Sequence, residues 1–161
     1  GKTALIWASS NGHLNIVKLL VSKGADVNSK NSKGRTALMR ISELSDKIEI
    51  VRYLISKGAN IKAKDKNGHC ALMMSVILNY PDMAKYLLLK GADVNAKDNM
   101  GQTNLIWASA KGYVKIAELI LSKGANINAK DNKGKSALFY AQQFRRQRIV
   151  KLLLKHGAKK D

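Results

Sequence analysis

The opening residues Gly1-Lys2-Thr3 are the first in this chain whose types and spacing suggest chemistry, because they resemble the end of a phosphate-binding loop. In such a loop, backbone N–H groups and a lysine hold a phosphate. The corresponding positions further along the chain read Gly-Arg-Thr, Gly-His-Cys, Gly-Gln-Thr and Gly-Lys-Ser. A turn that recurs with these variations explains the tripeptide better than phosphate binding does.

The residue types that most often form catalytic or metal sites are scattered. The histidines and the single cysteine are His13, His69, His156 and Cys70. The histidines lack the spacing of metal ligands, and no histidine lies one helical turn from Cys70 to act as its base. Three aspartates share one turn position, where bonds to the backbone account for them: Asp65, Asp98 and Asp131. We therefore predict a non-enzymatic binding protein with no cofactor, metal ion or small-molecule substrate.

The charge balance is unusual. The 161 residues include 29 Lys and Arg against 11 Asp and Glu, a formal net charge of +18. A field of this sign favours acidic proteins, nucleic acid or anionic membrane surfaces as partners, although compositional drift on a tolerant surface explains it equally well. A single cysteine excludes an intrachain disulfide and is compatible with a reducing compartment such as the cytoplasm. No run of about 18 apolar residues predicts a membrane span.

The dipeptide Gly-Ala recurs at a nearly constant step. It occupies 24–25, 58–59, 91–92, 124–125 and 157–158, so the steps are 34, 33, 33 and 33 residues. Self-similarity at this period indicates a stack of similar units rather than one irregular globule. The segment 91–125 spans one whole period and is the reference unit. We predict a single domain over 1–161, with repeats at about 1–30, 31–64, 65–97, 98–130 and 131–161.

Each unit opens with a short predicted helix. The residue before its apolar run can act as a helix N-cap: Thr3, Thr36, Cys70, Thr103 and Ser136. Leucines two residues later are expected to form one buried column: Leu5, Leu38, Leu72, Leu105 and Leu138. Gly12 and Gly112 are predicted to end their helices in the left-handed conformation, and Asn79 and Arg145 hold this position in two other units. The third unit, with Cys70 as a poor cap and no glycine here, is predicted to open first.

A second helix follows in each unit, with apolar residues at helical spacing. Asp46 and Glu49 resemble a capping box in the second unit, and Pro81 falls in a first turn, where its missing N–H costs nothing. Four lysines place a cation at the negative end of the helix dipole: Lys23, Lys57, Lys90 and Lys123. After Gly-Ala, an extended polar segment such as 26–28 leads into a turn, and this predicts a projecting β-hairpin.

Helix, helix and hairpin within 33 residues, with GADVNAKD and TALxxA landmarks, resembles the ankyrin repeat, whose signature is T-P-L-H-x-A. The resemblance covers the whole chain and implies an all-α repeat solenoid, in which stacked helix-turn-helix pairs carry projecting β-hairpin loops. The proline of the signature is replaced by Ala4, Ala37, Ala71, Asn104 and Ala137. Its histidine is replaced by Ile6, Met39, Met73, Ile106 and Phe139. Apolar packing is expected to take the place of the His–Thr hydrogen bond.

Ankyrin-like stacks are known to bind partners with the hairpin tips and the exposed side of the first helices, which line a concave groove. By position, the resemblance selects ten Lys or Arg residues on this ridge against three turn aspartates, so the ridge is positive. We predict that the partner-binding residues of this concave face are Lys33, Arg35, Leu44, Lys66, His69, Ile77, Leu78, Met100, Gln102, Lys111, Lys133, Lys135 and Phe144.

Ile77 and Leu78 stand out on this face, because nothing in the repeat requires large apolar residues there. They could pack against a neighbouring loop, but we favour a contiguous patch with Leu44 and Met100 that marks a partner site. The two tryptophans share one repeat position, where a core or near-core role is expected, although a half-exposed tryptophan would make a good anchor: Trp7 and Trp107.

The leading hypothesis is a protein-interaction scaffold whose concave face holds an acidic protein segment with an apolar anchor. One alternative is unspecific, charge-driven binding of nucleic acid or an anionic membrane, because motifs for base readout are lacking. Another is the targeting portion of a larger enzyme or host-directed effector. The outer side of the first unit shows no polar substitutions, so we expect further repeats before residue 1 or another chain over this end, and otherwise a monomer.

Overall fold

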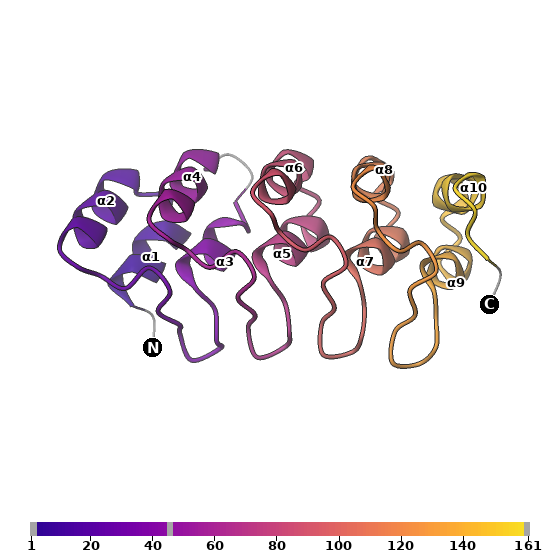
Figure 1. The fold of residues 1–161 in the computed structure, drawn as a ribbon, viewed down its shortest axis with the longest axis horizontal. Helices are drawn as coiled ribbons and strands as arrows, with labels where there is room; N and C mark the ends of the chain where they lie inside the picture. Colours follow the sequence, from indigo (N-terminus) through magenta and orange to yellow (C-terminus); the bar gives the residue numbers. More distant parts are fainter. Residues whose placement is uncertain (1–2, 45–46, 160–161) are drawn as a thin grey trace.

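A computed structural model of the chain describes residues 3–44 and 47–159. These residues form ten α-helices, arranged as five successive pairs (Figure 1). The first helix of each pair is α1 (Ala4–Ser10), α3 (Ala37–Ile41), α5 (Ala71–Ile77), α7 (Asn104–Lys111) or α9 (Ala137–Gln143). The second is α2 (Leu14–Ser22), α4 (Ile48–Ser56), α6 (Pro81–Leu89), α8 (Val114–Ser122) or α10 (Gln147–Lys155). First and second helices form two rows along the molecule, which confirms the predicted repeat solenoid.

The hydroxyl caps lie where the sequence predicted them. Thr36 and Thr103 accept hydrogen bonds from the backbone N–H groups of Met39 and Ile106 at 3.3 and 3.2 Å, and Thr3 and Ser136 cap α1 and α9 in the same way. Such a bond satisfies one of the backbone donors that a helix start leaves unpaired. Cys70 makes no side-chain cap bond at the start of α5, which fits its prediction as a poor cap.

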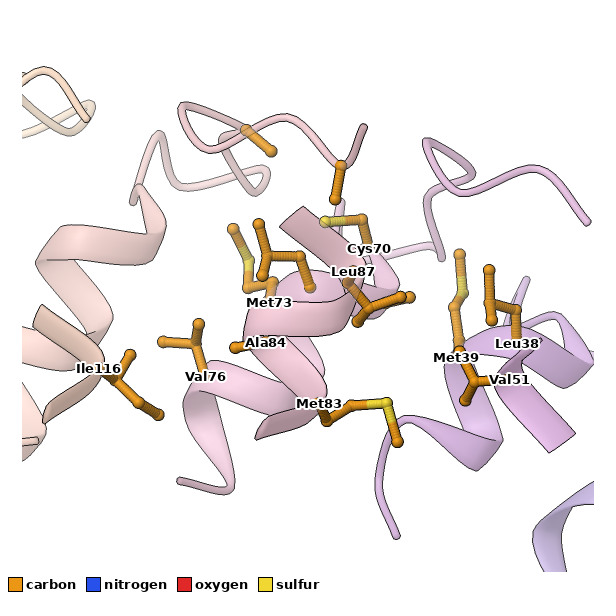
Figure 2. Close-up of a cluster of buried hydrophobic side chains, with 14 of the residues drawn as sticks. Leu38, Met39, Val51, Cys70, Met73, Val76, Met83, Ala84, Leu87 and Ile116 are labelled. Carbon is orange, nitrogen blue, oxygen red and sulfur yellow. The ribbon is translucent and has the colours of Figure 1, made fainter. Parts of the chain in front are cut away.

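The predicted leucine column lies in the core. Leu5, Leu38, Leu72, Leu105 and Leu138 are all buried. Figure 2 shows how adjacent units close around this core: Val76 points toward Ile116 of the next unit, and Met83 points toward the preceding unit. Ile6, Met39, Met73 and Ile106, at the position of the family's histidine, are also fully buried. Apolar packing therefore replaces that histidine in these four units, as expected, whereas Phe139 in the fifth unit is only half-buried.

The turn between the helices of a unit requires a left-handed residue. The φ angles are +72° at Gly12, +82° at Gly112, +61° at Asn79 and +54° at Arg145. Glycine adopts this conformation without steric cost, whereas a residue with a Cβ is strained there. In the second unit, α4 begins at Ile48, one residue later than the predicted capping box implies, and Asp46 of that box lies outside the described residues.

The loops between units project beyond the row of first helices (Figure 1). They are hairpin-shaped, but the described residues contain no strand, and β pairing is limited to the bridges Lys97–Thr103 and Lys130–Ser136. The prediction that residues 26–28 are extended is wrong. The backbone N–H of Asn28 donates to the Asp26 carboxylate at 2.9 Å, and that of Ser29 donates to the Asp26 carbonyl. This local bond folds the segment into an Asx-type turn.

Within the described ranges, no helix is long and apolar enough to cross a membrane. At the N-terminal end of the stack, Ile16 is exposed. Its counterparts Ile50, Met83, Ile116 and Ile149 are buried. The difference arises because each of these counterparts packs beside a preceding unit.

Candidate partner-binding face

The projecting loops and the first helices form one side of the stack, which we call the loop face. Each loop turn is organised by a buried aspartate: Asp65, Asp98 and Asp131 are each 8% exposed. One oxygen of each carboxylate accepts two backbone N–H bonds, as at Asp98, where the donors Met100 and Gln102 both lie at 2.9 Å. The sequence predicted these Asx bonds, and they use half of each carboxylate for local structure.

The second carboxylate oxygen of each aspartate accepts from a side chain. Arg35 Nε donates to Asp65 at 3.1 Å, Trp107 Nε1 to Asp98 at 3.0 Å and the Tyr140 hydroxyl to Asp131 at 2.6 Å. The two aromatic rings are therefore held by their polar ends, with the remainder of each ring half-buried. Trp107 thus has a structural role near the core, as expected. The same expectation is wrong for Trp7, whose side chain is 49% exposed.

The Tyr140–Asp131 bond also sets the protonation of both groups. Burial alone would raise the pKa of the Asp131 carboxyl, but the hydrogen bonds from Tyr140 and the backbone N–H groups of Lys135 and Lys133 outweigh it and hold that pKa below its usual value. The hydrogen bond to Asp131, together with burial, raises the pKa of Tyr140. At neutral pH the pair is therefore a neutral phenol bonded to a carboxylate.

The loop tips are tied to one another across unit boundaries. The N–H of Lys66 donates to the Lys33 carbonyl at 3.1 Å, and the N–H of Asn99 donates to the Asn67 carbonyl at 3.0 Å. The lysines just before the turns contribute as well, because the amines of Lys30, Lys64 and Lys97 donate to a backbone carbonyl in the next loop. These bonds make the tips a continuous ridge.

The predicted cationic residues fall into two groups. Arg35 is engaged internally, because it forms ion pairs with Asp65 and with Glu43 at 2.9 Å, and Arg40 pairs with the same Glu43. Lys135 lies over the ring of Phe139, 4.2 Å from its centroid. Four other cations are exposed and form no side-chain hydrogen bond or ion pair in the described part of the chain: Lys33, Lys66, Lys111 and Lys133. The charge of Lys133 nevertheless helps to lower the pKa of Asp131.

A hollow of about 320 Å³ lies between the loop that precedes α3 and the loop that precedes α5. We call it the basic hollow, and its lining is Ser32, Lys33, Arg35, Asp65, Lys66 and Asn67. It brings together three of the predicted residues, Lys33, Arg35 and Lys66. Its single acid, Asp65, is already bonded to Arg35 and to the backbone. The hollow therefore presents positive charge to solvent.

A second hollow lies between α7 and α9. We call it the aromatic pocket; its volume is about 290 Å³ and its lining is Gln102, Ile106, Trp107, Ala110, Lys111, Tyr140, Phe144 and Arg146. The sequence selected Gln102, Lys111 and Phe144 but missed the other side chains. A signal for two of them exists, because an aromatic hydrogen-bond donor follows the turn aspartate by nine residues in the fourth and fifth units.

The remaining predicted residues are more dispersed. Leu78 and Met100 are 43% and 55% exposed, whereas Leu44 and Ile77 are half-buried against the core. His69 is half-buried between two carboxylates, with ring nitrogens 3.9 Å from Asp65 and 3.8 Å from Asp98. These positions leave Leu78 and Met100 as the accessible members of the predicted apolar patch.

Two kinds of reactive site, a metal site and a nucleophilic cysteine, lack support among the described residues. No group of three or more His, Cys, Asp or Glu side chains in this part of the chain could hold a metal ion. The thiol of Cys70 is buried, and burial raises its pKa, so it is a poor nucleophile.

Two rows of paired helices and a ridge of linked loops define a helical repeat scaffold with a positively charged side. The sequence model described as "Ankyrin repeats (3 copies)" matches residues 5–98, 46–131 and 96–161. Since these matches extend over most of the sequence, the chain belongs to the ankyrin repeat family. Such repeats generally mediate protein–protein interaction and are typically non-enzymatic.

A short segment of the chain is also similar to a plant protein. Over 35 residues it is 60% identical to a probable E3 ubiquitin-protein ligase, XBOS33, of Oryza sativa subsp. japonica. The match covers 22% of this chain and 7% of that relative. It therefore concerns about one repeat.

Proposed function

We propose that this chain is a protein-interaction module whose loop face binds an acidic segment of a partner protein. The proposal rests on a difference between the acidic and the basic side chains of that face: the acidic ones are bonded within the protein, and several lysines are not. The turn aspartates are buried and accept hydrogen bonds on both carboxylate oxygens, whereas Lys33, Lys66, Lys111 and Lys133 are exposed and form no side-chain hydrogen bond or ion pair in the described residues.

The physical consequence is a positive field that the protein does not compensate itself. Uncompensated charge on an interface attracts complementary segments, speeds their association and disfavours basic partners. The linked loop tips add preorganisation, because a rigid surface loses less entropy when a partner binds. Together these features favour an extended acidic segment that runs along the ridge.

The alternative is binding by net charge alone, to nucleic acid or an anionic membrane. The second helices offer a matched comparison, because they carry exposed lysines of their own, Lys18, Lys85 and Lys151. If binding depended only on net charge, the lysines on both sides of the stack would contribute to it. If the loop face is the binding site, only the lysines of that face would contribute.

The test compares two triple variants with the same change of net charge. One is Lys33→Glu/Lys66→Glu/Lys133→Glu on the loop face, and the control is Lys18→Glu/Lys85→Glu/Lys151→Glu. A displayed library of random 15-residue peptides is selected against the wild-type chain, and the affinities of the enriched peptides are measured by fluorescence anisotropy.

The expected result is enrichment of peptides rich in Asp and Glu, with affinity reduced about tenfold or more in the loop-face variant and little in the control. Enriched peptides without excess acid would overturn the proposal. Equal losses in both variants, with equally strong binding of single-stranded DNA or anionic vesicles, would favour the charge-driven alternative.

A further inference from the structure

We propose that the aromatic pocket between α7 and α9 is the anchor site of the loop face, and that it takes an aromatic side chain flanked by Asp or Glu in the partner segment. This inference rests on the proposed function and adds the position and chemistry of the anchor. It places the anchor at the boundary of the fourth and fifth units, whereas the sequence had predicted it at Ile77 and Leu78 of the third unit.

The pocket differs from the other unit boundaries in its walls. The repeat position of Trp107 is filled by Trp7, Arg40, Met74 and Tyr140 in the other units. Aromatic residues thus occupy this position in two adjacent units only at the boundary of the fourth and fifth. Phe144 extends the wall, because its ring stacks on that of Tyr140 with 6.3 Å between centroids and 13° between planes.

Hydrogen bonds within the protein hold the aromatic side chains of these walls in place without a partner. The indole N–H of Trp107 is bonded to Asp98, and the hydroxyl of Tyr140 is bonded to Asp131. Both polar groups are already satisfied, so the rings offer apolar surface to the pocket without leaving a polar group unpaired. Side chains held in this way lose little conformational entropy on binding.

Two cations stand beside the apolar walls. Arg146 Nε donates to the Ala110 carbonyl at 3.1 Å, and a Cβ at Gly112 would lie 2.9 Å from Arg146 Cδ. The arginine stem is therefore held across the unit boundary, while its terminal nitrogens remain able to bind a carboxylate with two parallel bonds. Lys111 adds an exposed second charge, and the described lining contains no acid.

The volume of the aromatic pocket limits the size of the group that it can bind. An apolar cavity of roughly 150 Å³ holds one benzene molecule, and small-molecule sites begin at roughly 300 Å³. At about 290 Å³, the pocket accommodates one large side chain and part of its neighbours. Aromatic walls with cations at one edge fit an aromatic residue next to a carboxylate, because the charge of that carboxylate complements Arg146 and Lys111.

Three labelled 12-residue peptides test the anchor. The first has one Phe flanked by Glu in an acidic background, the second replaces that Phe with Ala, and the third keeps Phe but moves both flanking Glu residues away from it. The protein variants are Phe144→Ala, Arg146→Gln and, as the matched control, Leu78→Ala. Leu78 occupies the same repeat position as Phe144 and is similarly exposed, at 43% against 49%. A Trp7→Phe background makes Trp107 the single tryptophan and hence a fluorescence reporter of the pocket.

We expect the first peptide to bind the wild-type chain about tenfold or more tightly than the second, because a buried Phe side chain adds apolar contact. Phe144→Ala should abolish this preference, and Arg146→Gln should abolish the preference for the first peptide over the third. Leu78→Ala should change neither. Trp107 fluorescence should respond to the first peptide and not to the second.

Equal binding of the first two peptides would overturn the anchor, and if Lys33→Glu/Lys66→Glu/Lys133→Glu still weakened both, the proposed function would stand. A preference lost in Leu78→Ala and kept in Phe144→Ala would move the anchor to the third unit. Failure of every acidic peptide to bind would refute the proposed function itself. Binding of 3-phenylpropionate as tight as that of the first peptide would show a small-molecule site and overturn the peptide anchor.

Discussion

Replacement of Cys70 by threonine should stabilise the third unit, because it supplies the cap bond that α5 lacks. The equivalent Thr36 and Thr103 cap their helices at 3.3 and 3.2 Å. They are 2% exposed, and Cys70 is 4% exposed. A threonine side chain therefore fits this environment elsewhere in the stack, so Cys70→Thr is expected to add a bond without strain.

The magnitude follows from the chemistry of the cap. A thiol is a weak acceptor, and loss of a hydroxyl cap costs about 1 kcal/mol, with a range of about 0.5–2. Cys70→Thr should therefore raise the free energy of unfolding by about 1 kcal/mol. For a chain of this size, that corresponds to a rise of about 2–4 °C in Tm. The reciprocal variant Thr103→Cys should lower the free energy of unfolding by a similar amount.

Urea unfolding followed by circular dichroism measures the global change, and amide exchange measures it unit by unit. Repeat arrays open in parts, so the wild-type chain should exchange fastest in α5 and α6. Cys70→Thr should slow exchange there more than elsewhere. A neutral Cys70→Thr variant alongside a destabilised Thr103→Cys variant would refute the reasoning, as would uniform protection across the five units of the wild-type chain.

Two further predictions concern the fifth unit. The left-handed φ of +54° costs a residue with a Cβ roughly 1–2 kcal/mol, and the greater freedom of glycine in the unfolded chain offsets roughly 0.4–1 kcal/mol of this. Arg145→Gly should therefore stabilise the chain by about 0.5–1 kcal/mol; an unchanged midpoint in urea would show that the turn is not strained. Tyr140→Phe should cost about 1.5–3 kcal/mol at pH 7, since it removes a hydrogen bond to the charged carboxylate of Asp131. The low pKa of Asp131 adds stability that is fully present above the unfolded pKa of about 3.9 and is lost progressively as the pH falls from there through the lower folded value. The cost should therefore shrink in acid, and an equal cost at pH 2.5 and pH 7 would contradict this.

The sequence predicted best those features whose partners lie a few residues apart. Thr103 and Ile106 of a cap bond are three residues apart, and the left-handed turn at Asn79 involves that residue alone. The Asx bonds at 65, 98 and 131 reach two and four residues along the chain. Such contacts recur with the period, so several units repeat the same signal.

One prediction about a local segment, that residues 26–28 are extended, was wrong. Residues 26–28 have the composition of an extended segment, yet the Asp26 carboxylate bonds to the N–H of Asn28 and forms a turn. The sequence contained both partners of this bond. The same bond recurs in the later loops, where Asn60, Asp93 and Asn126 accept from the N–H two residues ahead. The period therefore carried a signal for the turn, which the extended-like composition of the segment obscured.

The candidate site was only partly predictable. The sequence selected Lys33, Lys66 and Lys133 as cations of the face, but it could not show that Arg35 is engaged by Asp65, 30 residues away. It selected Phe144 and Lys111, yet not that they share a pocket with Trp107 and Arg146. These groupings depend on how one unit is placed against the next.

The sequence by itself thus determined the period, the helix caps, the buried leucine column and the excess of positive charge, because each follows from residue type and near neighbours. Tertiary structure decided which cations remain unpaired and where aromatic surface is available. Those properties arise from contacts about one repeat apart, such as Arg146 with Ala110. Residue spacing alone does not fix the geometry of such contacts, since they depend on how adjacent units pack.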